Sequence, residues 1–91
     1  MAKELTVHKN RISGMYYLGY NVRNPDKRID FSDINSMLNY LRSNDEEAAS
    51  LRSRRNLVFH LDVPDSEYAL LESSLIAVCP KSTIAKIQGR H

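Results

Sequence analysis

The side chains of this chain best suited to acid–base chemistry are His60 and Asp62. They stand two residues apart in a segment where apolar and polar residues alternate, so in a strand they would share one face. A carboxylate beside an imidazole can orient it for proton transfer near neutral pH. A His and an Asp that simply face solvent give the same pattern far more often. We therefore predict no catalytic residues, and a small nuclease or hydrolase that uses this pair is our third interpretation.

Metal, cofactor and thiol chemistry have weaker support. The three histidines and the single cysteine, Cys79, do not have the spacing of a metal site. The three glycines are scattered, so the sequence contains no glycine-rich phosphate-binding loop. Cys79 follows a predicted helix, and the negative end of a helix dipole raises a thiol pKa and opposes nucleophilic reactivity. We expect no metal, no cofactor and a buried or half-buried, structural cysteine.

Tyrosines and arginines are the stronger candidates for binding. Residues 14–20 read Gly-Met-Tyr-Tyr-Leu-Gly-Tyr, and in a strand Tyr16 and Tyr20 would share one face while Tyr17 lies on the other. Tyr and Arg dominate the hot spots of protein interfaces. Exposed rings can also stack on bases while arginines hold phosphates. In the alternative interpretation, one set of tyrosines packs under the helices and Tyr17 is ordinary strand surface.

A second basic group consists of Arg52, Arg54 and Arg55. These arginines could complement the C-terminal end of a helix dipole, clamp a phosphate, or form a basic patch for an acidic protein partner. Lys86 and Arg90 on the last predicted strand could extend that patch. The predicted partner-binding residues are Tyr16, Tyr17, Tyr20, Arg23, Arg28, Arg52, Arg54, Arg55, Lys86 and Arg90.

Charge is distributed along the chain in blocks. The net charge of +2 is weaker than that of a typical duplex-DNA binder. Residues 56–80 contain four acids and no Lys or Arg, whereas residues 79–91 contain basic residues and no acid. This pattern is typical of a solvated surface of mixed sign, or of a basic face opposite an acidic helix.

Targeting signals are not apparent in the sequence. It has no apolar run of eighteen residues that could span a membrane, and its first eight residues lack the apolar block of a signal peptide. A single cysteine suits a reducing compartment. We therefore expect a cytoplasmic protein that does not associate with membranes.

The elements that must position these side chains follow from the hydrophobic spacing. Residues 4–8 and 15–22 alternate as strands, and a turn near residues 13–14 is favoured over one at residues 9–10. Residues 24–26, Asn-Pro-Asp, predict a further turn, and residues 28–31 could form a short third strand. The clearest helix begins at Asp30 or Ser32 and ends near residue 43. Its apolar stripe consists of Ile34, Met37, Leu38 and Leu41.

The second half of the chain adds two or three elements and a last strand. Asn44 and Glu47 form a capping-box pattern, which indicates a second helix over residues 45–54 or an extension of the first. Residues 56–63 alternate as a strand, and Ser66 is placed to cap a helix over residues 67–78. Residues 83–88 predict the last strand.

Ninety-one residues with 42% apolar content predict one α+β domain over residues 1–91. We expect two layers in the order β-β-(β)-α-(α)-β-α-β, with a mostly antiparallel sheet of four or five strands and two or three helices on one face. The Tyr- and Arg-rich open face or edge would then dock on a protein partner, which predicts a non-catalytic inhibitor, adaptor or regulator. Single-stranded RNA or DNA binding is the alternative, and self-association through an edge strand is a further expectation.

Overall fold

The computed structural model describes residues 3–20 and 28–87, apart from the side chain of Tyr20. Five strands and three helices follow one another along these residues: β1 (Lys3–Lys9), β2 (Tyr16–Tyr20), β3 (Arg28–Phe31), α1 (Ile34–Arg42), α2 (Glu46–Ser53), β4 (Leu57–Asp62), α3 (Asp65–Val78) and β5 (Thr83–Lys86). The third strand and the second helix, which the sequence left open, are both present. The turn predicted at residues 24–26 and the predicted binding residues Arg23 and Arg90 lie outside the described residues.

The sheet is mixed, with the strand order β3-β2-β1-β4-β5. β1 pairs antiparallel with β2, and β2 with β3, whereas the β1–β4 and β4–β5 pairs are parallel. The prediction of a mostly antiparallel sheet is therefore wrong. Helices connect β3 to β4 and β4 to β5, and such a crossover returns the chain to the same end of the sheet, so the strands that it joins run parallel.

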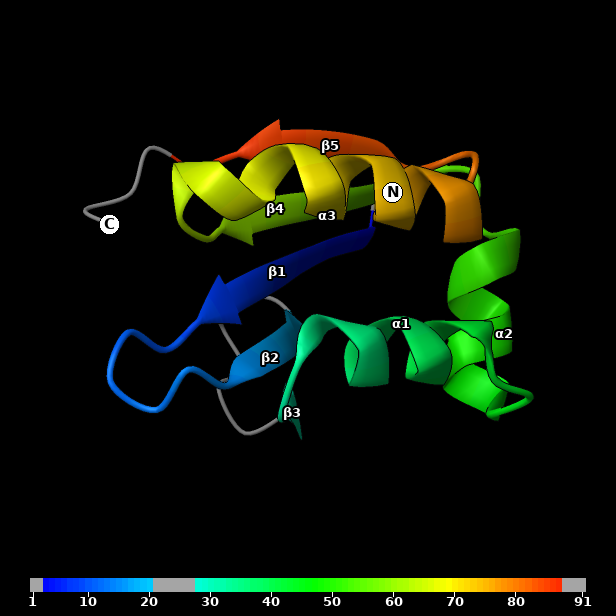
Figure 1. Cartoon of the computed structure of the whole chain (residues 1–91). Coiled ribbons are helices and arrows are strands. Elements are labelled where there is room, and N and C mark those ends of the chain that lie inside the picture. Colours follow the sequence, from blue (N-terminus) through cyan, green and yellow to red (C-terminus); the bar gives the residue numbers. More distant parts are fainter. Residues whose placement is uncertain (1–2, 21–27, 88–91) are drawn as a thin grey trace.

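The helices and the sheet form two layers (Figure 1). α1 packs over β2 and β3, α3 packs toward the β5 edge, and α2 lies at one end of the sheet. Burial follows the alternation of each strand: in β4, Leu57, Phe59 and Leu61 are buried beneath the helices, while the residues between them are half-buried on the other face. The predicted α+β class is confirmed, and α1 and α3 lie on the side of the sheet that carries the buried residues.

Helix starts differ from the predicted positions by one to four residues. Asp33 caps α1 by accepting a hydrogen bond from the backbone N–H of Ser36, at 2.7 Å. Asp45, rather than Asn44, caps α2. α3 begins at Asp65 directly after Pro64, without a side-chain cap. Several neighbouring polar residues can serve as a cap, and the path by which the chain enters the helix selects one of them.

The loop between β1 and β2 is held by Asn10. Its side-chain Oδ1 accepts hydrogen bonds from the backbone N–H groups of Ile12 and Ser13, and its backbone N–H donates to the carbonyl of Met15. Gly14 has a φ of 75°, a backbone conformation that favours glycine. Both predicted turn dipeptides therefore contribute to one loop. None of the helices among residues 3–20 and 28–87 is long and apolar enough to cross a membrane.

Candidate functional site

The candidate site is the face of the sheet opposite the helices, which we call the open face. Strand alternation places mostly polar side chains there, because the buried apolar residues of each strand face the helices. No described helix covers this face. From one edge of the sheet to the other it presents Arg28, Asp30, Tyr17, Gly19, Glu4, Thr6, His8, Val58, His60, Asp62, Thr83 and Ala85.

A continuous row of contacts crosses four strands of the open face. Arg28 on β3 lies with its guanidinium carbon 5.0 Å from the centre of the Tyr17 ring on β2. That ring lies 4.7 Å from the ring of His8 on β1, and His8 Nδ1 is 2.6 Å from Asp62 Oδ2 on β4. Arg28 also forms an ion pair with Asp30, at 3.3 Å. We call these five residues the Tyr17 row.

A second histidine–carboxylate pair lies farther along the same two central strands. His60 Nε2 on β4 is 3.0 Å from Glu4 Oε1 on β1. His60 and Asp62, which the third interpretation combined, each contact a side chain of β1. His8 lies directly opposite Asp62, across neighbouring strands that are only about 4.8 Å apart, whereas residues i and i+2 of one strand lie almost 7 Å apart. His60 lies opposite Thr6 and reaches Glu4 diagonally.

The open face carries more carboxylates than permanent cations. The described residues of the face include three carboxylates, Glu4, Asp30 and Asp62, and one permanent cation, Arg28. The face also carries two histidines, His8 and His60. The side chains of His8 and Asp62 are about one-quarter exposed, so both can be reached from solvent. With neutral histidines the described part of the face is negative, which suits a basic or hydrogen-bonding surface better than a phosphate backbone.

Tyr16, a predicted binding residue, faces the helices and is only 5% exposed. Its hydroxyl donates a hydrogen bond to Glu67 on α3, and Lys9 Nζ donates to the other carboxylate oxygen of Glu67 at 2.8 Å. Burial and the hydrogen bond to Glu67 raise the pKa of Tyr16. Burial alone would raise the pKa of Glu67, but the hydrogen bonds from Lys9 and Tyr16 and the charge of Lys9 lower it overall. Tyr16 is thus a core residue and does not belong to the open face.

Arg52 also has a structural role. Its Nη1 donates hydrogen bonds to the backbone carbonyls of Leu41, at 2.5 Å, and Ser43, at 2.7 Å. These carbonyls lie at the C-terminal end of α1, so Arg52 joins α2 to the preceding helix. Arg52 therefore complements a helix C-terminus, as one interpretation predicted, but this is the C-terminus of the neighbouring helix α1 rather than that of its own helix α2.

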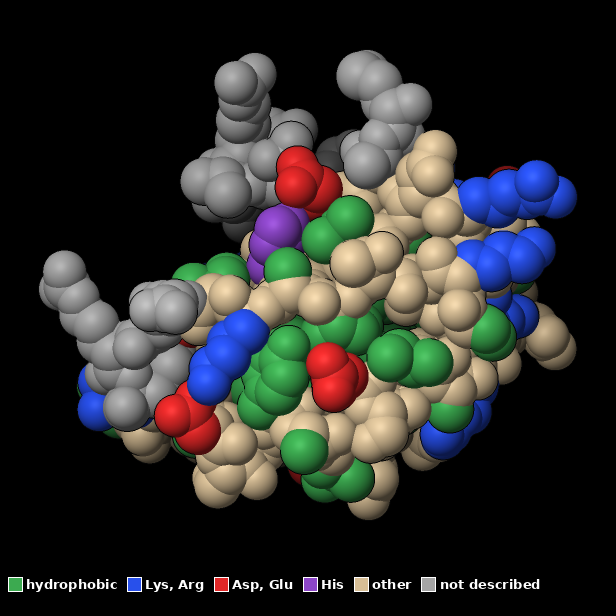
Figure 2. Space-filling view, turned by 90° about the horizontal axis from the view of Figure 1, so that it is seen from above, with side chains coloured by type: hydrophobic (Ala, Val, Ile, Leu, Met, Phe, Trp, Pro, Cys, Tyr) green, Lys and Arg blue, Asp and Glu red, His purple; other side chains and the backbone are tan. Residues whose placement is uncertain are grey.

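Arg54 and Arg55 are exposed, but they lie far from the Tyr17 row. They lie three and two residues before the first residue of β4, and Lys81 lies two residues before β5, so the parallel strands place all three at one end of the sheet. Figure 2 shows Lys and Arg side chains gathered at that end, on the right. Tyr17 pairs with His8, next to the final residue of β4, at the opposite end. Arg54 and Arg55 therefore do not form one patch with Tyr17, unlike Arg28.

Lys86 was predicted to bind a partner, and Cys79 was predicted to be structural. Lys86 points to the helix side, where its Nζ lies 2.6 Å from Asp65 Oδ1 and 5.4 Å from the centre of the Tyr68 ring. Cys79 is 2% exposed, and burial raises its pKa while the charge of Arg52 opposes this effect. The predicted buried cysteine is confirmed, with burial as the cause of its raised pKa.

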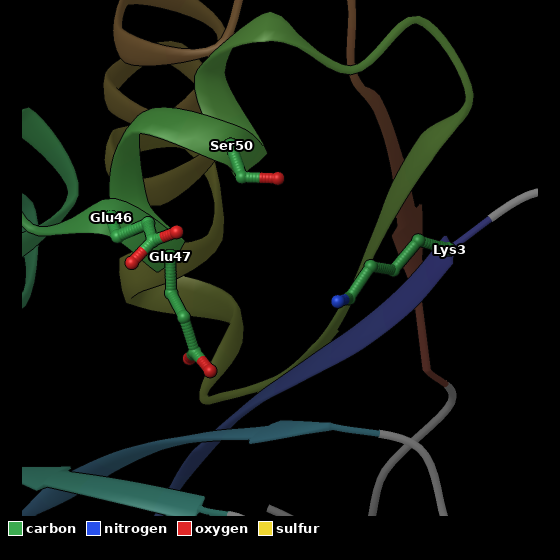
Figure 3. Close-up of a pocket in the computed structure, with 4 residues that line it drawn as sticks. All are labelled: Lys3, Glu46, Glu47 and Ser50. Carbon is green, nitrogen blue, oxygen red and sulfur yellow. The ribbon is translucent and has the colours of Figure 1, made fainter.

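A pocket of about 400 Å³ lies between α2 and the start of β1, away from the Tyr17 row. Figure 3 shows its four lining side chains, which are Lys3, Glu46, Glu47 and Ser50. All four are polar, and the apolar walls that usually hold a small molecule are missing from this lining. Among the described residues, no group of three or more His, Cys, Asp and Glu could hold a metal ion.

Sequence reasoning missed His8, Asp30 and Glu4 as members of the site. Each stands at a strand position whose alternation places it on the polar face, so the face of each could have been read from the sequence. Their partners depend on the order of the strands and on the register, which the alternation does not specify. No protein-family model, no curated protein and no solved structure matches this chain.

Proposed function

We propose that this chain is a non-catalytic binding protein, an inhibitor, adaptor or regulator, that docks on a protein partner through the open face of its sheet. The observation that carries this proposal is the Tyr17 row. It combines an aromatic ring with an arginine, the two residue types that most often anchor interfaces, on a face without a covering helix among the described residues.

The contacts within the row favour binding because they restrict its side chains before a partner arrives. Tyr17 lies between Arg28 and His8, and His8 is in turn held by Asp62. Ordering a free, rotamer-rich side chain at an interface costs about 0.5–1.5 kcal/mol. A row that is already ordered avoids part of this cost. The carboxylates around it favour a partner surface that offers lysines, arginines or backbone N–H groups.

Nucleic-acid binding is less well supported by the same residues. The only ring of the strand-forming tyrosines described on the open face, Tyr17, lies opposite Asp30, and its other neighbour, His8, is held by Asp62. The arginine beside Tyr17 already pairs with Asp30. Arg55, a candidate phosphate contact, belongs to the other end of the sheet. Stacking and phosphate contact would therefore have to occur at separate places on the molecule.

Affinity capture from lysate of the native host, with and without nuclease, tests the proposal. Tyr17→Ala and Arg28→Ala should each lose the captured protein, whereas the matched control Arg54→Ala at the opposite end should retain it. Truncating one hot-spot residue typically costs 2 kcal/mol or more, roughly a thirtyfold loss of affinity. Circular dichroism of each variant confirms folding.

Two outcomes would contradict the proposal. One is a protein that is captured equally by the wild type and by correctly folded Tyr17→Ala and Arg28→Ala. The other is capture that nuclease abolishes, together with oligonucleotide binding that weakens steeply as salt is added. The second outcome would support the nucleic-acid alternative.

A further inference from the structure

The outer side of α3, away from the sheet, carries two large apolar side chains in solvent. Leu70 is 58% exposed and Ile76 is 43% exposed. Ala69, Ser73 and Ala77 are exposed around them. Figure 2, which views the molecule from the side of β5 and α3, shows hydrophobic side chains at this surface. Most amphipathic helices turn a charged side to solvent, and α3 departs from this pattern along its middle.

These residues are arranged symmetrically along the helix around Ser73. Leu70 and Ile76 stand three residues before and after it, and Ala69 and Ala77 stand four residues before and after it. In two antiparallel helices related by a two-fold axis at Ser73, Leu70 of one copy would be level with Ile76 of the other. The alanines would likewise be level with each other and allow the helices to approach closely. A two-fold interface requires this self-complementarity.

Charges of opposite sign lie at the two ends of α3. Asp65 is its first residue, and Lys81 lies in the turn three residues after its last residue, Val78. Both are exposed, with 84% of the Asp65 side chain in solvent. An antiparallel pair brings Asp65 of one copy toward Lys81 of the other at both ends, where it joins the existing ion pair of Asp65 with Lys86. The antiparallel helix dipoles also attract. Glu72, half-buried beside Ser73, lies at the flank of this surface.

From this match of apolar, small and charged residues we infer that a second copy of the chain packs on α3, forming an antiparallel helix pair with its two-fold axis at Ser73. The surface lies on the helix side of the molecule, so both open faces of the dimer stay accessible. The inference does not rest on the proposed function, but together they make the protein bivalent toward its partner.

The size of the surface sets the expected strength of the dimer. A helix of 14 residues is about 21 Å long, so the pair buries less than the roughly 1,200 Å² at the lower limit of a standard interface. We therefore expect a weak dimer in rapid exchange. The edge strands β3 and β5 have four residues each, and such short edges give little backbone for strand-to-strand association.

Sedimentation equilibrium of the purified chain, from about 1 µM to about 1 mM, tests the inference, because that range spans the affinities of weak complexes. The mean mass of the wild type should rise with concentration from the monomer value of 10.5 kDa toward twice that value. Ser73→Glu and Ser73→Lys each place like charges on both sides of the two-fold axis. Each should weaken association at least about tenfold.

An equimolar mixture of the two variants should associate again, because the mixed pair has opposite charges at the axis. Both variants replace an exposed serine within the helix by a good helix former, so folding should be retained. Ala49→Glu, at an exposed position of α2, is the control and should associate like the wild type.

A constant monomer mass for the wild type across the range would overturn the inference. So would association that both Ser73 variants retain, which would indicate an edge strand or the open face as the contact. In either case, capture of a partner by monomeric protein and its loss in Tyr17→Ala would still test the proposed function separately.

Discussion

Tyr16 and Tyr17 are neighbours on β2, yet they lie in opposite environments. Tyr16 faces the helices and is 5% exposed, and its hydroxyl donates a hydrogen bond to the carboxylate of Glu67. Tyr17 faces away from the helices and packs between Arg28 and His8. The alternation of a strand thus assigns one tyrosine to the core and the other to the candidate interface. Arg52 and Arg28 differ in a similar way: Arg52 on α2 is half-buried and binds backbone carbonyls, whereas Arg28 lies on the open face beside Tyr17.

The largest expected contrast is between alanine variants of the two tyrosines. Tyr16→Ala removes a buried ring and should lower the free energy of unfolding by about 3–5 kcal/mol. Tyr17→Ala removes only contacts across strands on the open face, worth about 0.2–1 kcal/mol. Urea denaturation followed by circular dichroism measures both values. Equal losses in the two variants would show that the open face is as important to the fold as the core.

The two arginines give the next contrast. Arg52→Ala leaves the carbonyls of Leu41 and Ser43 without their charged donor, which should cost about 1.5–3 kcal/mol. Arg28→Ala should cost less than about 1 kcal/mol, because its ion pair and its contact with the Tyr17 ring are exposed to solvent. Urea unfolding of the two variants gives midpoints that can be compared. An Arg28→Ala variant less stable than Arg52→Ala would contradict the assignment of a structural role to Arg52 and a surface role to Arg28.

The stabilisation that Glu67 contributes on the helix side of the sheet depends on pH. Its pKa in the folded chain lies below the ordinary value of 4.5, so its ionised form stabilises the fold fully above pH 4.5, and this stabilisation is lost as pH falls through the lower folded value. Glu67→Gln should therefore cost about 1–2 kcal/mol at neutral pH, with the difference from the wild type shrinking in acid. Urea denaturation at a series of pH values between neutral and strongly acidic checks this. A difference that grows on acidification would contradict the stated direction.

Tyr16, which hydrogen-bonds to Glu67, makes the stability of the fold depend on pH in the alkaline range as well. Its pKa is raised above 10.0 in the folded chain, mainly by burial, so its stabilising effect is complete below pH 10 and is lost as pH rises through the raised value. Tyr16→Phe removes the ionisable group, and its stability should therefore fall less steeply than that of the wild type above pH 10. The same denaturation series, extended to alkaline pH, measures the slopes.

The layers of the fold were predictable from the sequence, but the pairings within the sheet were not. The stripe of Met37, Leu38 and Leu41 and the alternation of residues 57–62 identify a helix, a strand and the side of each that is buried. The alternation is the same whether the neighbouring strand runs parallel or antiparallel, so it could not specify the mixed sheet. The direction of β4 depends on the helical crossover that precedes it.

The candidate site was predictable to the extent that it depends on alternation. Tyr17 and Arg28 were identified because their residue types suit an interface, and the structure brings the two side chains together. Tyr16 and Lys86 were assigned to the same surface, although both point to the helix side. His8 was overlooked because its partner, Asp62, is 54 residues away, and only the β1–β4 pairing brings them together.

The smallest expected effect concerns the pair of Glu4 and His60 on the open face. Their side chains are 57% and 31% exposed, and exposed ion pairs contribute about 0.2–1 kcal/mol. A double-mutant cycle with Glu4→Gln and His60→Gln should give a coupling energy at the lower end of this range, and added salt should reduce it further. The matching cycle with Lys9→Met and Glu67→Gln should give a larger coupling, because Glu67 is also held by the buried Tyr16. If the Glu4–His60 coupling were the larger of the two, the open-face pair would contribute chiefly to folding. A small coupling means that substitutions at this pair can change binding with little effect on the fold.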